Sequence, residues 1–297
     1  MIVLGVFGPT ASGKSAVAAA VGERVDADVV SADAMQVYEG LPILTNRSPY
    51  PERLVGIWPL SHRASVGEYA PLAHAAVDEI LSAGRVPVVV GGTGLYFRAA
   101  LADLSLPPAP AEDARERWSR LYDDVGAETA HARLAALDAE AAARVHPNDR
   151  RRVVRALELA EAGASLVPGD DRLFGGAWRH PTLVVGLDVP KDVLERRIEL
   201  RARAMFGAGV EDEVRRALRG PVSDTARRTI GLEEIATLPR EEAIIALVVR
   251  TRRYAAYQRK WMRRLEGAAI VAADRPPGEV ADDILSLARA RERLRRP

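Results

Sequence analysis

The 297-residue sequence contains no cysteine. Its absence excludes disulfides, thiolate zinc sites, iron–sulfur clusters and cysteine nucleophiles, and it agrees with a reducing compartment. The sequence also lacks any stretch near the roughly 18 uninterrupted apolar residues that a membrane-spanning helix needs, and no basic leader precedes its first apolar segment. We therefore expect a cytoplasmic protein that does not span a membrane.

An excess of charge of either sign is missing as well. Lys and Arg number 42 against 41 Asp and Glu, which gives a formal net charge of +1. This balance excludes a protein that coats nucleic acid with its whole surface, but it allows a local basic patch. Hydrophobic residues at 48% and charged residues at 28% are close to globular averages, so the composition excludes a disordered chain.

Short apolar runs alternate with segments of helical periodicity. The runs span residues 2–7, 28–31, 86–90, 182–189 and 269–272, and the main helical segments span 66–83, 94–102, 190–206, 208–219 and 240–265. Strands that are apolar along their whole length are typical of parallel sheets covered on both faces. The alternation therefore predicts an α/β fold with a parallel sheet.

Residues 8–15 match the phosphate-loop pattern G-x-x-x-x-G-K-[ST] between a predicted strand and a predicted helix. Glycines let successive backbone N–H groups face an anion at the helix N-terminus, a lysine adds positive charge, and a serine can ligate Mg²⁺. We predict a di- or triphosphate site, with Mg²⁺ as cofactor on Ser15, formed by Gly8, Pro9, Thr10, Ala11, Ser12, Gly13, Lys14 and Ser15. The pattern alone leaves open whether the phosphate is transferred, hydrolysed or released.

The stretch from 107 to 180 differs from the rest of the chain. It shows no strand pattern, and helical periodicity dominates from 111 to 162. We interpret it as an inserted helical subdomain, with residues 1–106 and 181–297 forming a P-loop core. Four glycine or proline residues between 167 and 178 predict a loop at its exit.

Two polar motifs follow predicted strands at the same edge of the sheet. Asp33 comes directly after the second strand, where it could serve a ligand or cap a helix. After the third strand, Gly91, Gly92 and Gly94 surround Thr93. Three glycines at this place predict that something approaches the backbone closely.

Cations cluster in two places, with five arginines between residues 144 and 155 and seven basic residues between 250 and 264. In the second cluster Tyr254, Tyr257 and Trp261 lie on one helical face, which predicts that the aromatic rings face the core and the cations face solvent. Exposed cations can bind phosphates of a nucleic acid. The alternative is a solvated helix face whose arginines pair with residues such as Glu158. We interpret His146 as structural.

Together these motifs resemble the tRNA dimethylallyltransferases, also called tRNA isopentenyltransferases. That family's pattern runs GPTASGKS, then S-x-D-S-x-Q-x-Y, then GGTGLY, and its later motifs are similar to residues 146–158, 230–233 and 251–261. The chain departs from the pattern at residues 41–48, at Ile57-Trp58 in place of a histidine pair, and at Tyr257 in place of an arginine. These departures concern substrate detail more than chemistry.

The resemblance implies transfer of a dimethylallyl group from its diphosphate to N6 of the adenosine 3′-adjacent to the anticodon of tRNA, with release of pyrophosphate. The amine needs a base, for which Asp33 is the candidate. The other implied catalytic residues are Thr10, Lys14, Thr93 and Arg201. The implied tRNA contacts are Asp33, Ala34, Met35, Gln36, Thr93, Arg115, Arg151, Arg152, Arg155, Arg228 and Gly231.

The expected partners are therefore dimethylallyl diphosphate and the anticodon stem-loop of tRNA, without an obligate protein partner. Three alternatives stay open. One is a P-loop kinase acting on a small molecule, and another is an adenylate isopentenyltransferase acting on free nucleotide. The third is a tRNA-binding relative that has lost catalysis.

Overall fold

The computed structural model describes residues 2–104, 113–166 and 177–293. The chain divides into two compact units, residues 1–103 with 173–297, and residues 104–172. We call the first the sheet unit and the second the helical unit. Most of the loop predicted for 167–178 lies outside the described residues.

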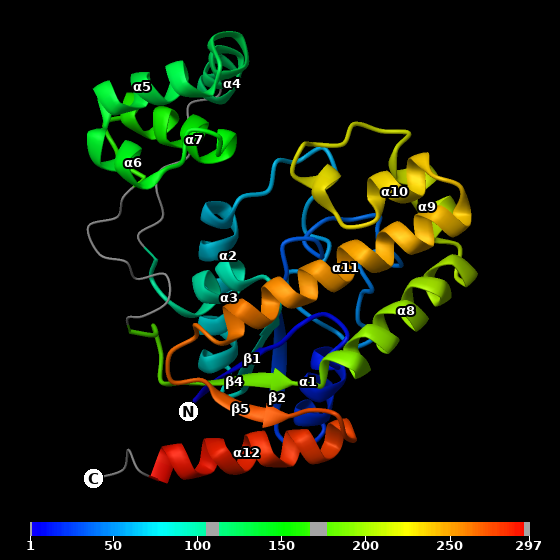
Figure 1. Cartoon of the computed structure of the whole chain (residues 1–297). Coiled ribbons are helices and arrows are strands. Elements are labelled where there is room, and N and C mark those ends of the chain that lie inside the picture. Colours follow the sequence, from blue (N-terminus) through cyan, green and yellow to red (C-terminus); the bar gives the residue numbers. More distant parts are fainter. Residues whose placement is uncertain (1, 105–112, 167–176, 294–297) are drawn as a thin grey trace. The chain divides into compact units, whose positions relative to one another are not determined.

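A parallel sheet of order β2-β3-β1-β4-β5 forms the centre of the sheet unit (Figure 1). Its strands are β1 (Val3–Phe7), β2 (Ala27–Ala32), β3 (Val86–Gly91), β4 (Thr182–Asp188) and β5 (Ala269–Ala272). This confirms the predicted parallel α/β fold. Gly91 of β3 pairs with Phe7 of β1 and with Ala32 of β2, so three strands end side by side.

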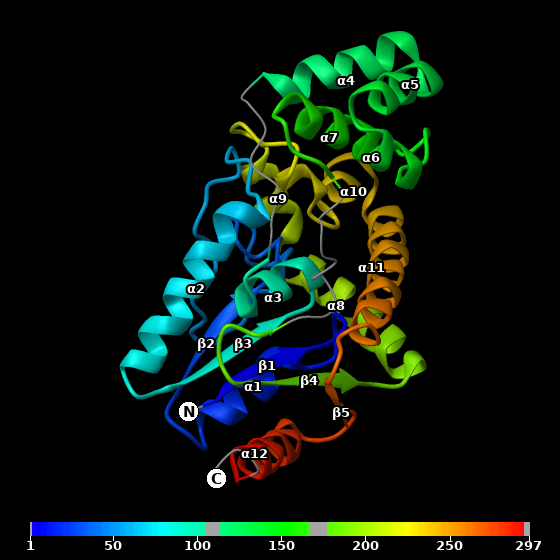
Figure 2. The ribbon, with the colours of Figure 1, turned by 90° about the vertical axis from the view of Figure 1, so that its left-hand side faces the viewer.

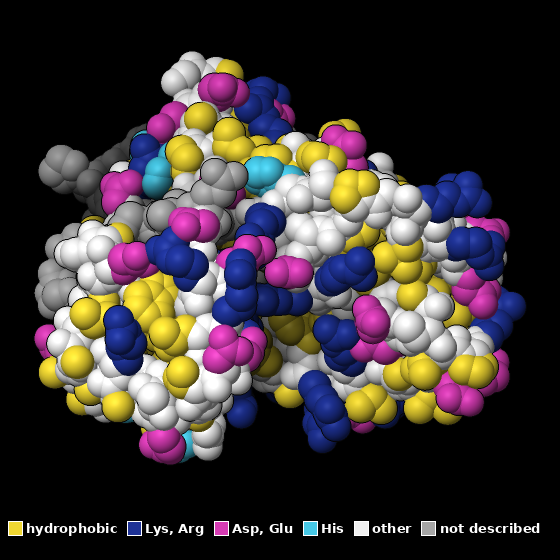
Figure 3. All heavy atoms as spheres, turned by 90° about the horizontal axis from the view of Figure 1, so that it is seen from above, with side chains coloured by type: hydrophobic (Ala, Val, Ile, Leu, Met, Phe, Trp, Pro, Cys, Tyr) yellow, Lys and Arg dark blue, Asp and Glu magenta, His cyan; other side chains and the backbone are white. Residues whose placement is uncertain are grey.

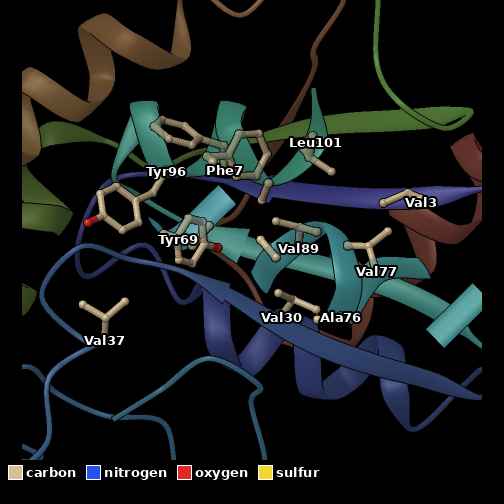
Figure 4. Packing of buried hydrophobic residues seen from close by; sticks show 14 of the residues in the cluster. Val3, Phe7, Val30, Val37, Tyr69, Ala76, Val77, Val89, Tyr96 and Leu101 are labelled. Carbon is tan, nitrogen blue, oxygen red and sulfur yellow. The ribbon is translucent and has the colours of Figure 1, made fainter. Parts of the chain in front are cut away.

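Helices cover both faces of the sheet, as the uninterrupted apolar strands predicted. Helices α1 (Lys14–Gly22) and α12 (Pro277–Arg293) cover one face, and α2 (Val66–Ser82) and α3 (Gly94–Leu101) cover the other (Figures 1 and 2). Side chains alternate along β1, since Val3 and Phe7 pack toward α2 and α3 while Leu4 and Val6 pack toward α1 and α12. Figure 4 shows Phe7 between Tyr96 and Leu101 in the core under α2 and α3.

A third group of helices extends from the carboxyl edge of the sheet. It contains α8 (Lys191–Gly207), α9 (Val210–Ala217), the 3₁₀ turn η1 (Ala226–Arg228), α10 (Leu232–Thr237) and α11 (Arg240–Met262). Helix α11 runs along α8 (Figure 1), and the two share a core that also takes in Leu41 and Leu44. The two helices therefore have an apolar wall in common.

The helical unit contains α4 (Ala114–Val125), α5 (Ala127–Leu137), α6 (Ala139–Arg144) and α7 (Arg150–Glu161) around its own core. Leu134, Val153 and Leu157 are fully buried there. No strand occurs in its described part, residues 113–166, as predicted. Across all the described residues, every helix is too short or too polar to cross a membrane.

Candidate active site

A cavity of about 390 Å³ opens where β1, β2 and β3 end. The phosphate loop forms one wall, and the segment after β2 forms the next. Side chains of α8 and α11 close the remaining sides. The site thus combines segments from four distant parts of the sheet unit.

The phosphate loop has the backbone that its sequence predicts. Gly13 has a φ of 88° and stands at the N-cap of α1, where a positive φ favours glycine. Ala11 also has a positive φ, 65°, which is uncommon for a residue with a Cβ. The first N–H groups of α1 have no partner within their helix and lie at the cavity. They offer an anion site without a side chain.

Two partly buried cations stand at this anion site. Lys14 Nζ donates a hydrogen bond to Pro9 O at 2.8 Å, and Arg201 Nη2 of α8 donates to Thr10 Oγ1 at 2.7 Å. The pKa of Lys14 is lowered to about 8, mainly by burial; the charge of Asp33 opposes the shift and the nearby positive charge of Arg201 adds to it. Burial likewise lowers the pKa of Arg201. Each cation lacks a full counter-charge, so a bound anion stabilises both.

Asp33 also lines the cavity and directly follows the end of β2. Its Oδ1 accepts the N–H of Met35 at 2.8 Å and closes a turn. The capping alternative is wrong, because residues 34–37 form a turn and no helix begins there. Its carboxylate interacts electrostatically with both Lys14 and Arg201.

The glycines after β3 are explained by helix α11. A Cβ added to Gly92 would lie 2.2 Å from Gln258 Nε2, and one added to Gly94 would lie 2.1 Å from the Trp261 ring. The predicted close approach is therefore real, and it comes from the chain's own side chains. Gln258 accepts the N–H of Thr10 at 2.7 Å and donates to Gly92 O at 2.9 Å. This buried amide ties the phosphate loop to the glycine turn.

Thr93 belongs to the same network. Its Oγ1 accepts the N–H of Ala34 at 3.2 Å and lies 3.2 Å from the hydroxyl of Tyr254. Burial raises the pKa of Tyr254, so its hydroxyl stays protonated and can donate. Thr93 thereby connects the turn after Asp33 with helix α11.

The expectation that all three aromatic rings of α11 face the core is wrong for Tyr257. Trp261 is buried and Tyr254 is partly buried, but Tyr257 is 54% exposed. Its hydroxyl accepts a hydrogen bond from Trp261 Nε1 at 2.8 Å. The phenol can reach this partner from the surface, so burial of the ring is not needed.

The predicted residues fall into two groups within the sheet unit. Those that line the cavity are Thr10, Ala11, Gly13, Lys14, Ser15, Asp33, Met35, Gln36 and Arg201. Those that belong to the sheet unit without lining it are Gly8, Pro9, Ser12, Ala34, Thr93, Arg228 and Gly231. Arg228 is exposed on η1, and its assignment as a tRNA contact stays a prediction.

Gln36 and Gly231 have structural roles that the motifs do not reveal. Gln36 Oε1 accepts from Ser31 Oγ at 3.1 Å, and its Nε2 donates to Thr45 O at 3.2 Å. Gly231 has a φ of 94°, and a Cβ there would lie 2.8 Å from a methyl group of Leu44. Their predicted tRNA contacts stay predictions.

The arginines of the helical unit are more engaged than expected. Glu158, whose side chain is fully buried, pairs with Arg115 at 2.7 Å and with Arg155 at 3.0 Å. Arg150 and Arg152 also have ion pairs. Arg151 is exposed and has no ion pair among the described residues. Such ion pairs agree with the alternative of arginines that pair with residues such as Glu158, and the tRNA contacts of Arg115, Arg151, Arg152 and Arg155 stay predictions.

One face of the molecule shows a similar mixing of charge. On the face seen in Figure 3, Lys and Arg side chains lie next to Asp and Glu side chains instead of forming one continuous basic area. In the second basic cluster, Arg250 pairs with Glu234 and Arg259 pairs with Asp188. The clusters in the sequence therefore overstate the basic surface.

Three side chains that line the cavity are not predicted as site residues by the sequence. Gln258 and Tyr254 stand in a motif that indicated only helix and family, and Glu52 stands in an irregular, proline-containing segment without a pattern. No local signal points to Glu52, since only the fold brings it to the phosphate loop.

Comparison with known proteins agrees with the geometry. The family model "IPP transferase" matches residues 36–265, and the model "Isopentenyl transferase" matches residues 1–58. A tRNA dimethylallyltransferase of Corynebacterium jeikeium is 36% identical over 298 residues, covering 96% of both chains. One of Salinispora arenicola is 40% identical over 276 residues, covering 88% of this chain and 80% of the relative.

A solved structure extends the likeness to the fold. The full-length tRNA isopentenylpyrophosphate transferase of Bacillus halodurans has a TM-score of 0.70 and 30% identity, and the match covers 99% of this chain and 98% of that one. The relatives therefore share the helical unit as well as the sheet unit. The regions matched by the two family models contain the phosphate loop, Asp33 and Gln258 of α11, and the relatives match nearly the whole chain. The chain therefore belongs to the IPP transferase family.

Proposed function

We propose that this transferase moves the dimethylallyl group of dimethylallyl diphosphate to N6 of the adenosine 3′-adjacent to the anticodon of tRNA and releases pyrophosphate. One observation carries the proposal. The cavity that contains the phosphate loop and Asp33 also has an apolar wall, formed by Leu44, Ile198 and Met205. A prenyl diphosphate is an anion joined to a short hydrocarbon, and this cavity offers a surface for each part.

The cationic side of the cavity suits the leaving group. When the bond between carbon 1 of the prenyl group and the diphosphate oxygen breaks, negative charge develops on pyrophosphate. Lys14, Arg201 and the N–H groups at the start of α1 stand ready to stabilise that charge without rearrangement. Their burial strengthens the effect, because little solvent screens them.

Asp33 is suited to accept the proton. As N6 of the adenine forms its bond to carbon 1, the amine must lose one proton, and the carboxylate of Asp33 takes it. The predicted role of Thr93 in orienting the amine is supported by its contact with the hydroxyl of Tyr254, which lines the cavity, and by the bond it accepts from Ala34 N–H. A base that is stacked in the anticodon loop cannot reach this cavity, so the adenosine must be turned out of the stack.

A divalent cation fits the residues at the phosphate loop, and we propose Mg²⁺. The hydroxyl of Ser15 and the carboxylate of Glu52 both line the cavity, and Glu52 Oε1 is buried without a hydrogen-bond partner among the described residues. Hydroxyl and carboxylate oxygens are ligands that Mg²⁺ prefers. Bound there, it would supply positive charge to the leaving pyrophosphate.

The decisive experiment gives the protein one labelled donor and a choice of acceptors. Purified protein with Mg²⁺ is incubated with [¹⁴C]dimethylallyl diphosphate and either tRNA or AMP, and in a separate arm with [γ-³²P]ATP. We expect label in tRNA alone, and nuclease digestion should place it on the adenosine next to the anticodon. Label in AMP would indicate the adenylate enzyme, and transfer from ATP would indicate a kinase. Binding of tRNA without transfer would identify a relative that has lost catalysis.

Replacing Lys14 or Ser15 with Ala should weaken use of the diphosphate without weakening binding of tRNA. Lys14 and Ser15 face the cavity at the phosphate loop, whereas a tRNA backbone binds cations on the surface. We expect KM for the diphosphate to rise for both variants and the dependence on Mg²⁺ to change for Ser15→Ala. Filter binding measures the tRNA affinity in parallel. An equal loss of tRNA affinity and turnover would contradict the separation of the two sites.

Arg151 and Arg155 should differ in how they affect tRNA binding. If the exposed Arg151 contacts a phosphate, Arg151→Ala should reduce the slope of log affinity against log salt by about 0.7 to 0.9. Arg155→Ala should lower the stability of the helical unit, because it leaves the buried Glu158 with one partner fewer. Binding titrations over a salt series measure the first effect and urea unfolding measures the second. An unchanged slope for Arg151→Ala would remove Arg151 from the binding surface.

A further inference from the structure

Glu52 is a carboxylate that the fold delivers to the phosphate loop. It precedes Arg53, which is fixed to the edge of the sheet because Ser31 N donates to Arg53 O at 3.0 Å and Arg53 N donates to Val29 O at 2.8 Å. The Arg53 side chain adds ion pairs to Asp28 at 3.1 Å and to Glu79 at 2.8 Å. Glu52 is therefore held at the cavity wall by backbone and side-chain bonds of its neighbour.

The charge of Glu52 is poorly compensated by the protein. Burial raises its pKa, and the like charge of Asp33 raises it further, while the hydroxyls of Ser48 and Ser15 and the charge of Lys14 act in the opposite direction. One of its oxygens, Oε1, is buried and accepts no hydrogen bond in the described part of the chain. A buried carboxylate is retained at such a place only if something offsets the cost of desolvation. A cation would do so.

Other carboxylates near the loop are less suited to a metal ion. In P-loop NTPases an aspartate joins the loop serine or threonine at Mg²⁺. Here β3, next to β1, ends in Gly91 and continues with Gly92. Asp188 at the end of β4 pairs with Arg259 at 3.3 Å and does not line the cavity. Asp33 is engaged by Met35 N–H and serves as the proposed base.

We propose that Glu52 is the acidic partner of the divalent cation at the phosphate loop, so that Ser15 and Glu52 hold Mg²⁺ against the diphosphate, directly or through its water ligands. The inference rests on the proposed function, because it presupposes a diphosphate in this cavity. It adds a residue from the irregular segment that follows β2. The cation would separate two groups that otherwise repel each other, namely Glu52 and the diphosphate.

This arrangement predicts that Glu52→Gln weakens pyrophosphate binding when Mg²⁺ is present and strengthens it when Mg²⁺ is absent. With Mg²⁺ present, Glu52→Gln should weaken pyrophosphate binding by about 10- to 100-fold, the range found when partners of a metal site are removed. With EDTA in place of Mg²⁺, the same variant should bind pyrophosphate more tightly than the wild type, because a negative charge has been removed beside the anion. Isothermal titration with pyrophosphate in both buffers gives the two affinities without any catalytic assay.

Two further variants make the comparison specific. Glu79→Gln removes an exposed carboxylate that pairs with the same Arg53 but lies outside the cavity, so both affinities should stay at the wild-type values. Glu52→Asp keeps the charge and should retain part of the Mg²⁺-dependent affinity. Electron paramagnetic resonance of Mn²⁺ with pyrophosphate and each variant reports the metal directly, and circular dichroism checks the fold.

Tighter pyrophosphate binding by Glu52→Gln in both buffers would mean that the carboxylate only repels the anion, which overturns the inference. Equal affinity of wild type and variant with Mg²⁺ would overturn it as well. If dimethylallyl transfer to tRNA is observed in either case, the proposed function stands. If the wild type itself does not bind pyrophosphate with Mg²⁺, the inference and the proposed function fail together.

Discussion

Replacing Asp33 with Asn should reduce the rate of dimethylallyl transfer by about a hundred- to ten-thousandfold, the usual contribution of a general base. Asn keeps an oxygen that can accept the N–H of Met35, so the turn after β2 is preserved. It cannot accept a proton from the amine. Single-turnover transfer from labelled dimethylallyl diphosphate to tRNA measures the effect, and Asp33→Ala should lose at least as much.

Binding measurements separate this result from a general loss of structure. Asp33 opposes the charges of Lys14 and Arg201, so Asp33→Asn should bind pyrophosphate at least as tightly as the wild type. Affinity for tRNA should change little. Transfer within tenfold of the wild type, or a loss that follows unfolding alone, would show that Asp33 is not the base.

Replacing Gln258 with Ala should lower the free energy of unfolding by about 2–6 kcal/mol, because two backbone groups lose their partner and each unsatisfied buried group costs about 1–3 kcal/mol. The amide of Gln258 joins Thr10 N to Gly92 O, so its removal releases the phosphate loop from the glycine turn. Transfer should fall even under conditions where the variant stays folded. Urea unfolding gives the stability, and single-turnover transfer gives the effect on the site.

Two matched variants test the reason for that loss. Gln258→Glu keeps an oxygen for Thr10 N–H but cannot donate to Gly92 O, and its charge would face that carbonyl, so it should be destabilised although its size is unchanged. Lys260→Ala changes an exposed residue two positions away on α11 and should shift stability by less than about 0.5 kcal/mol. If Gln258→Ala and Lys260→Ala have the same free energy of unfolding, the two hydrogen bonds of Gln258 do not stabilise the fold.

Features that depend on neighbours along the chain could be predicted from the sequence. The phosphate loop is one such feature, because its eight consecutive residues carry both the glycines and the charged groups of the anion site. The parallel sheet is another, since β1, β3 and β4 are apolar along almost their whole length and helical segments separate the strands. Asp33 was found because the end of a strand identifies one edge of such a sheet.

By itself the sequence determined the order of strands and helices, the phosphate loop and the carboxylate at its edge, because these follow from periodicity and from motifs of adjacent residues. Only the tertiary structure decided which side chains complete the site. Gln258 hydrogen-bonds to the loop across 248 positions of sequence, Glu52 reaches the cavity from an irregular segment, and Glu158 pairs with Arg115 and Arg155. Such contacts depend on how distant segments pack, and no local pattern records that packing.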